Sequence, residues 1–144
     1  VAGREIGNPA RLPEVIRHIQ EINTRCDVLL IEGAGGLLSP LGEDFSSSEI
    51  IDALDCRTIV VAPNRLGVIN DVRLTVRALA EKPSTSIVLM DPSTPDASTP
   101  NNLGVLECLL PGIEIHPFPR LSGKPSDELN SALNRISQHL QQPR

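Results

Sequence analysis

The stretch Asp27-Val28-Leu29-Leu30-Ile31-Glu32-Gly33-Ala34-Gly35-Gly36 decides which fold this chain is expected to have. Its Val, Leu and Ile residues follow one another without polar alternation, which is typical of a strand covered on both faces, as in a parallel sheet. Glu32 would then stand at the carboxyl end of that strand, where open α/β sheets place their ligands. Gly33, Gly35 and Gly36 allow positive φ and a close approach of the backbone to a bound group. The stretch therefore predicts a strand that ends in the floor of a site for a charged ligand.

Composition narrows the class of protein. The 144 residues, 40% of them hydrophobic, are enough for one domain over residues 1–144. The net charge of -5 and the lack of a Lys/Arg cluster predict no nucleic-acid partner. No apolar run has the length of a membrane span and no signal peptide opens the chain, so we expect a cytoplasmic protein without a membrane partner. Because the chain starts at Val1 and not at Met, we also expect it to be part of a longer protein.

The periodicity along the chain alternates between helical and strand-like segments. We expect helices over about residues 9–25, 49–54, 68–81, 102–110 and from Ser126 onward, and further strands over 58–62, 86–90 and 113–115. The first helix carries an apolar stripe that predicts packing on a sheet. Turn-forming residues over 91–100 predict a surface loop. Alternation of this kind predicts an α/β fold, in which βαβ units build a parallel sheet flanked by helices.

Two motifs resemble those of the dethiobiotin synthetase family, which belongs to the P-loop NTPase superfamily. Residues 28–41 match its E-G-A-G-G strand-and-loop motif, and residues 65–75 match its L-G-x-I-N motif with the Leu-Thr that follows. Residues 87–92 lie where the family has an apolar strand ending in Asn-x-Pro, and residues 119–121 are similar to its Pro-x-Leu turn. The resemblance implies a three-layer, Rossmann-like P-loop NTPase fold with a parallel sheet, truncated at its amino terminus.

The resemblance also implies an activity, that of an ATP- and magnesium-dependent ligase of biotin synthesis. In that family 7,8-diaminononanoate reacts with CO2 to form a carbamate, ATP phosphorylates the carbamate, and the second amine closes the ring of dethiobiotin. The family binds the substrate carboxylate with a segment from the neighbouring subunit. A homodimer with C2 symmetry is therefore implied.

The family's roles can be carried over to matching positions of this sequence. Carboxylate oxygen suits magnesium, backbone N–H groups suit phosphoryl oxygens, and a helix amino terminus suits an anion. On this basis Glu32 would bind magnesium; Gly33, Ala34, Gly35 and Gly36 would contact the substrate carbamate and the phosphoryl group, with Gly35 and Gly36 as catalytic residues; Leu66, Gly67 and Asn70 would bind the substrate carboxylate; and Met90, Asp91, Pro119 and Leu121 would bind the nucleotide.

The sequence departs from the family in three respects. It contains no G-x-x-x-x-G-K-S/T loop, which cradles ATP phosphates, so these residues alone are expected to be inactive. Met90 replaces an Asn that reads adenine, and a thioether cannot pair with a purine edge as an amide does. Asp71 replaces a His, and a carboxylate in the first helical turn competes with an anion for the same helix end.

Each residue singled out also has an ordinary structural interpretation. Glu32 can be a solvated acid at a strand end, the glycines can form only a tight turn, and residues 66–70 can be a simple helix start. His18 and His139 are expected on the polar faces of helices, and His116 is either structural or part of a nucleotide pocket. For the function, the alternative to the ligase is a non-catalytic binding or dimerisation module with the same fold.

Overall fold

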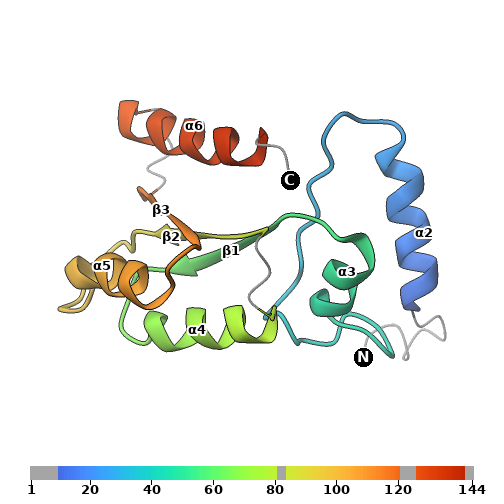
Figure 1. Cartoon of the computed structure of the whole chain (residues 1–144), viewed down its shortest axis with the longest axis horizontal. Helices are drawn as coiled ribbons and strands as arrows, with labels where there is room; N and C mark the ends of the chain where they lie inside the picture. The colour runs from blue at the N-terminus through green and yellow to red at the C-terminus, as the bar shows by residue number, and fades with distance from the viewer. Residues whose placement is uncertain (1–9, 81–83, 121–125, 142–144) are drawn as a thin grey trace. The chain divides into compact units, whose positions relative to one another are not determined.

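The computed structural model describes residues 10–80, 84–120 and 126–141. The chain divides into two compact units, Val1–Cys56 and Arg57–Arg144 (Figure 1). Whether residues 1–144 form one domain therefore stays a prediction. Leu121, which was assigned to the nucleotide, lies outside the described residues.

The second unit is built on a parallel sheet of three strands in the order β1-β2-β3. The strands are β1 (Thr58–Pro63), β2 (Thr85–Met90) and β3 (Glu114–Phe118). Pro63 is paired with Met90, and Met90 with Phe118, so the three strands end at one level. The strands expected over 58–62 and 86–90 are confirmed, and the third strand continues to Phe118, beyond the expected end at residue 115. The carboxyl ends of the strands thus form one edge on which polar residues can meet.

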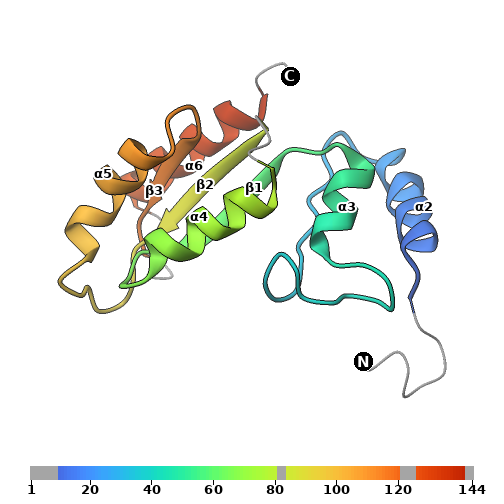
Figure 2. The same ribbon diagram turned by 60° about the horizontal axis from the view of Figure 1, so that its bottom comes forward.

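Helices cover both faces of this sheet (Figures 1 and 2). Alternate residues of β2 point to opposite faces: Ile87 and Leu89 join the core beneath α4 (Val68–Ala78) and α5 (Thr99–Leu109), while Val88 packs with α6 (Asp127–Gln141). The first core contains Ala62, Val68, Val72, Val76, Ile87, Leu89 and Leu106, and the second contains Val88, Phe118 and Ala132. The expected three-layer α/β architecture with a parallel sheet is confirmed for this unit.

Several helix boundaries differ from those expected, including those of α4 and α5. Helix α4 stops at Ala78 and Leu79 caps it, three residues before the predicted end. Helix α5 begins at Thr99, inside the segment that was predicted to be loop, with a proline in its first turn. Proline has no N–H to lose there and its fixed φ suits the helix start, so Pro100 begins the helix instead of preventing it.

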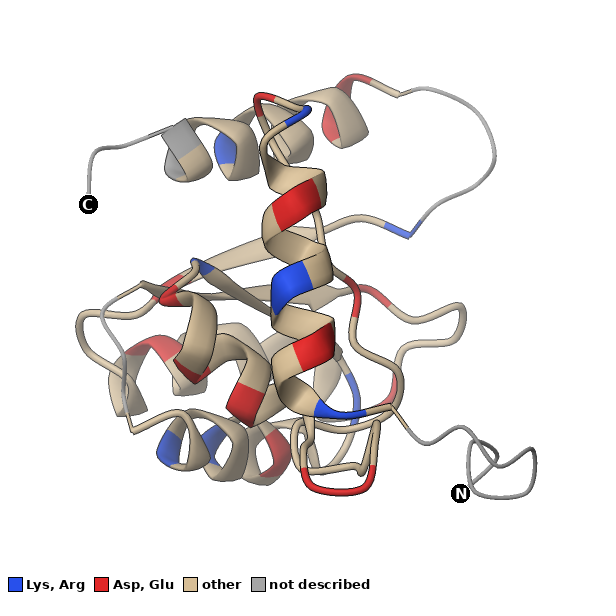
Figure 3. Cartoon of the chain, turned by 90° about the vertical axis from the view of Figure 1, so that its right-hand side faces the viewer, with Lys and Arg blue, Asp and Glu red and all other residues tan. Residues whose placement is uncertain are grey.

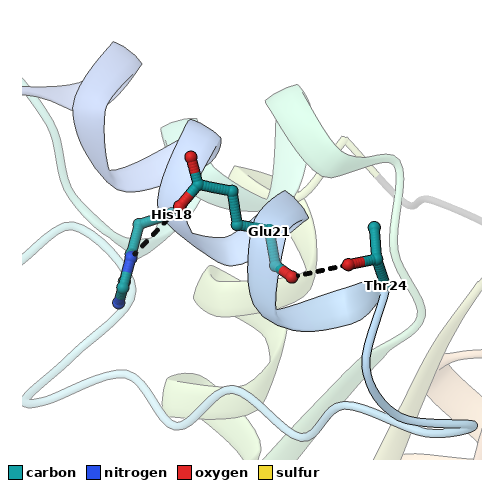
Figure 4. A network of polar contacts seen from close by, with 3 residues as sticks. All are labelled: His18, Glu21 and Thr24. Carbon is teal, nitrogen blue, oxygen red and sulfur yellow. Dashed lines mark hydrogen bonds and ion pairs between the residues drawn. The ribbon is translucent and has the colours of Figure 1, made fainter.

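The first unit contains α2 (Leu12–Asn23) and α3 (Ser47–Leu54). Within the unit α2 contacts α3 and has no buried residue, so its predicted packing on a sheet is not found there. Charges of both signs follow one another along α2 (Figure 3). His18 is exposed, as predicted, and its Nδ1 lies 3.9 Å from an Oε2 of Glu21, while the Thr24 hydroxyl donates to the Glu21 carbonyl (Figure 4). No helix of the described residues is long and apolar enough to cross a membrane.

The strand predicted over residues 28–31 is not formed, and this expectation was wrong for the structure of the unit. Val28 is 73% exposed and Leu30 is 78% exposed. A strand requires a neighbour that accepts and donates its ladder hydrogen bonds. The described residues of the first unit form helices α2 and α3 and no strand, so within its own unit the segment before Glu32 has no strand to pair with.

Candidate functional site

The glycine loop after Glu32 is a tight turn closed by a serine. Gly35 has φ 81°, a conformation that favours glycine, and the N–H of Gly36 donates to the hydroxyl of Ser39 at 3.0 Å. The N–H of Ser39 returns a bond of 2.9 Å to the Gly36 carbonyl. The N–H groups of Gly33, Ala34 and Gly35 have no acceptor within the described part of the chain. Three backbone donors in succession are therefore free to meet an anion.

The loop is fastened to the start of α3. A Cβ on Gly33 would lie 2.5 Å from the Ser47 hydroxyl oxygen, so a larger residue there would require the Ser47 side chain to turn away. Ser46 and Glu49 form a capping box, in which the Ser46 N–H and hydroxyl donate to the Glu49 carboxylate at 2.7 and 2.6 Å. These bonds from Ser46 lower the pKa of the Glu49 carboxyl. The Glu49 carboxylate is thus occupied in capping the amino terminus of α3 and is not offered to a ligand.

Glu32 is exposed, as a carboxylate that meets an ion from solvent must be. Among residues 10–80, 84–120 and 126–141, no group of three or more His, Cys, Asp and Glu residues could hold a metal ion by itself. Magnesium does not need such a group, because it is usually held by one or two carboxylates together with phosphate oxygens and water. One carboxylate beside three free N–H groups fits a magnesium ion that arrives with a phosphate.

A second group of predicted site residues meets at the carboxyl edge of the sheet. The N–H of Asn64 donates to the Met90 carbonyl at 2.7 Å, and the N–H of Asp91 donates to the Phe118 carbonyl at 2.9 Å. The Asn64 amide also donates to the Asp91 carboxylate at 3.3 Å. Met90 and Pro119 are half-buried and Asp91 is exposed. The structure therefore brings Met90, Asp91 and Pro119 to neighbouring strand ends, as the nucleotide assignment requires.

The residues predicted to bind the substrate carboxylate lie at the start of α4. Gly67 has φ 94° and precedes the helix, and the Leu66 side chain is 79% exposed. The N–H groups of Gly67, Ile69 and Asn70 have no acceptor among the described residues. The Leu66 N–H, in contrast, donates to the carboxylate of Asp96 at 2.7 Å. Of the N–H groups of Leu66, Gly67, Ile69 and Asn70, the last three are free, and that of Leu66 is already bound to the Asp96 carboxylate.

The side chains around this helix start are mixed in charge. The Asn70 amide donates to the Asp71 carboxylate at 3.5 Å. Farther along the same face, a hollow of about 100 Å³ is lined by Asn70, Arg73, Leu74 and Arg77. Asp71 thus lies beside the amide that was assigned to the substrate, whereas two arginines follow within two turns. A ligand carboxylate at this surface would meet one repelling and two attracting charges.

Sequence reasoning missed a polar cluster that holds this edge together. Its members are Asn64, Asp96, Ser98, Thr99 and Asn102. Asn102 is 3% exposed, and its amide donates to the Asn64 side-chain oxygen at 2.9 Å. The order Asp-x-Ser-Thr before an apolar run is a helix-start signal that could have identified Asp96. Nothing in the sequence indicates the pairing of Asn64 with Asn102, because 38 residues separate them.

Comparison with known proteins places these features in a family. A family model described as an AAA domain matches residues 2–115. The chain is 39% identical over 72 residues to an ATP-dependent dethiobiotin synthetase BioD of Sulfurovum sp. (strain NBC37-1). These residues are 50% of this chain and 34% of the relative. It is 43% identical over 77 residues to the Bacillus subtilis (strain 168) protein of the same name, covering 54% of this chain and 33% of the relative.

A longer match has lower identity. A Corynebacterium glutamicum (strain ATCC 13032) protein with the same name is 31% identical over 109 residues, which are 74% of this chain and 49% of the relative. The chain thus spans about a third to a half of the length of these relatives. The family model covers most of the chain and the relatives agree in name, so the chain belongs to the AAA domain family, a family of P-loop NTPase domains, as a dethiobiotin synthetase-like member.

Proposed function

We propose that this chain contributes to an ATP- and magnesium-dependent ligase that converts 7,8-diaminononanoate and CO2 to dethiobiotin. The single observation that carries the proposal is the exposed carboxylate of Glu32 followed by three free N–H groups in a turn that requires glycine at Gly35. Such a turn suits an oxyanion accompanied by a hard cation. The names of the relatives supply the use of ATP and the product, dethiobiotin.

In the proposed reaction the glycine loop acts on the carbamate and phosphoryl oxygens. Gly33 and Ala34 donate N–H groups to the substrate, and Gly35 and Gly36 direct theirs at the charge that develops during phosphoryl transfer. The Gly36 N–H must first be released by Ser39, since that hydroxyl accepts it at 3.0 Å. Glu32 would hold magnesium. When bound, ATP with magnesium would supply the phosphoryl group that activates the carbamate.

Two further sets of residues bind the ends of the ligands. Gly67 and Asn70, together with the backbone around Leu66, take the substrate carboxylate at the start of α4. Met90, Asp91 and Pro119 line the place of the adenine at the carboxyl edge of the sheet, and Leu121 is assigned to the adenine by the motif alone. The Asp91 carboxylate can accept from an adenine amino group, a role that the Met90 thioether cannot fill. The cytoplasm, where ATP is present, is the proposed location.

A homodimer is part of the proposal, because the start of α4 would serve the site of the neighbouring subunit. The surface there supports this assembly: Leu66 and Leu74 are 79% and 58% exposed, and Leu74 lines the hollow with Asn70 and two arginines. Exposed leucines next to polar anchors are typical of a surface that a partner covers. Light scattering should find a dimer, and a monomer at all concentrations would contradict this part.

The alternative function is a binding or dimerisation module that keeps the fold without the chemistry. The observation in its favour is that these 144 residues contain no G-x-x-x-x-G-K-S/T loop. The ligase therefore requires such a loop from outside these residues. Determining the complete gene decides this requirement directly, since a gene without that motif would exclude catalysis by this mechanism.

Isothermal titration calorimetry separates the two functions. Magnesium-ATP and 7,8-diaminononanoate are titrated separately into the protein encoded by the complete gene. A ligase binds both ligands. In Asn70→Ala the affinity for diaminononanoate should fall about tenfold, because a hydrogen bond to a charged group is lost, while the affinity for magnesium-ATP should not change. The control Asn101→Ala changes an exposed Asn of α5 and should bind like the wild type. Failure of the wild type to bind either ligand would leave the module as the function.

A further inference from the structure

Side chains from the first turn of α5 and from the turn before it bind three consecutive residues that lead into α4. The Asn102 amide donates to the Asn64 side chain at 2.9 Å and to the Arg65 carbonyl at 3.4 Å. The Asp96 carboxylate accepts the next N–H, that of Leu66, at 2.7 Å. These contacts join segments that are 30 to 38 residues apart in sequence. The loop between β1 and α4 is therefore fixed by side chains from another part of the chain.

Asp96 uses its two oxygens for two different purposes. Its Oδ1 accepts from the N–H groups of Ser98 and Thr99 at 2.8 and 3.1 Å and from the Ser98 hydroxyl at 2.6 Å, which satisfies the start of α5. Its Oδ2 accepts from Leu66. These hydrogen bonds, above all the one from the Ser98 side chain, keep the pKa of Asp96 well below its ordinary value. At neutral pH the Asp96 carboxylate is therefore charged, and it accepts hydrogen bonds both from the start of α5 and from Leu66.

The contact to Leu66 determines where the neighbouring N–H groups point. Gly67 follows Leu66 directly and has φ 94°, so fixing Leu66 sets the turn from which Gly67, Ile69 and Asn70 present their free donors. Asn102, buried between α5 and this loop, prevents the loop from moving away from α5. A ligand would then meet a prearranged set of donors and would not have to order them at binding.

We propose that Asp96 is a positioning residue for the substrate carboxylate, acting through the Leu66 N–H on the donors of Gly67, Ile69 and Asn70. This inference rests on the proposed function, in which the start of α4 takes that carboxylate. Asp96 does not touch the substrate itself. Its negative charge also disfavours anions that approach Leu66, so it restricts the carboxylate to the three donors that remain.

The test separates the two roles of Asp96 by substitution. Asp96→Asn keeps one acceptor oxygen for Ser98 and Thr99 but cannot offer a second to Leu66, because the other atom of an amide is a donor. Asp96→Ser is a second variant that keeps a capping oxygen too short to reach Leu66. Glu107→Gln removes a carboxylate from the exposed part of α5 and is the charge-matched control. All are made in the protein from the complete gene.

Two measurements are expected to change together. In Asp96→Asn, the dissociation constant for 7,8-diaminononanoate rises about tenfold while that for magnesium-ATP stays within about twofold. Hydrogen exchange at the Leu66 amide becomes at least about tenfold faster. Glu107→Gln changes neither. An unchanged dissociation constant for diaminononanoate in both Asp96 variants overturns the proposal, and so does an equal loss for both ligands, which would indicate a merely structural role.

Failure of the proposed function gives a different result. If the wild type binds no diaminononanoate, the substrate assignment is wrong, and the role of Asp96 in positioning that substrate falls with it. The hydrogen bond from the Leu66 N–H to Asp96 is then tested by hydrogen exchange alone. A Leu66 amide that exchanges equally fast in the wild type and in Asp96→Asn would show that this bond does not fix Leu66.

Discussion

Two segments of this chain have similar sequences and different structures. Residues 27–32 and residues 58–64 each run through consecutive apolar residues to a polar residue, Glu32 in the first and Asn64 in the second. The second segment forms β1 beside β2, and Asn64 is buried. The first is exposed and forms no strand. An apolar run therefore indicates a capacity to form a strand, and pairing with a neighbour decides whether the capacity is used.

The largest expected effect is a loss of stability on truncating a side chain in the sheet, compared with truncating one in the exposed segment. Ile87, beside β1 in the sheet, has no exposed surface, so Ile87→Ala should destabilise the chain by ~2–5 kcal/mol through lost burial and a cavity. Leu30 is 78% exposed, so Leu30→Ala should change stability by less than ~0.5 kcal/mol. Urea denaturation of the two variants measures both values.

The Leu30 variant is the informative member of this pair. A loss above ~1 kcal/mol for Leu30→Ala would show that the segment is buried in solution, as a paired strand would be. The comparison between the two segments would then be wrong, and the strand originally predicted over residues 28–31 would be reinstated.

A smaller effect is expected from adding one methyl group to the glycine loop. Gly35 has φ 81°, so Gly35→Ala should cost ~1–2 kcal/mol from the strain of a left-handed conformation. At Gly36 an added Cβ would lie 3.6 Å from the Ser39 hydroxyl, an ordinary contact, and Gly36→Ala is the matched control with a smaller cost. Thermal unfolding compares the two, and equal melting temperatures would show that the turn is not held in this form.

The smallest expected effect is the response of each unit to acid. Glu49 in the first unit and Asp96 in the second both have lowered pKa values, chiefly because of hydrogen bonds from Ser46 and Ser98. The folded state then binds fewer protons than the unfolded state near the ordinary carboxyl pKa of about 4. The stabilisation is present above that pH and is lost as the pH falls through the folded-state values.

Substitution of each carboxylate tests this pH dependence. Glu49→Gln and Asp96→Asn should each reduce the fall in melting temperature between about pH 5 and pH 3, because one shifted carboxyl is removed. The exposed residue Glu14 serves as the control in Glu14→Gln. A variant that loses stability with acid as steeply as the wild type would contradict the lowered pKa of the residue it replaces.

The sequence predicted the sheet unit well for a definite reason. Each of its strands is paired or covered, so the pattern of apolar residues and the observed burial have the same cause. The first unit was predicted less well, because the exposure of Val28 and Leu30 depends on a partner strand that no local pattern can specify. The motifs predicted roles for Glu32, the glycines after it and the start of α4 because each motif is a short run of neighbouring residues, and these roles stay predictions.

The polar cluster around Asn64 was not predicted, because its contacts are not local in sequence. Asn64, Asp96 and Asn102 contribute through contacts across 30 or more residues, and only the fold brings them together. Asp96 was assigned to a turn-rich loop, although its place before Ser98 and Thr99 also suits a helix start. A local signal of this kind predicts the cap of α5, but it cannot predict that the second oxygen of Asp96 holds Leu66.

The formation of dethiobiotin tests the central claim most directly. The protein encoded by the complete gene is given 7,8-diaminononanoate, magnesium-ATP and labelled bicarbonate, and labelled dethiobiotin is measured for the wild type, Glu32→Gln and the control Glu14→Gln. The account predicts product from the wild type and the control, and a loss of about 100-fold or more in Glu32→Gln, because a ligand of the metal is removed. No product from the wild type, or full activity in Glu32→Gln, would contradict it.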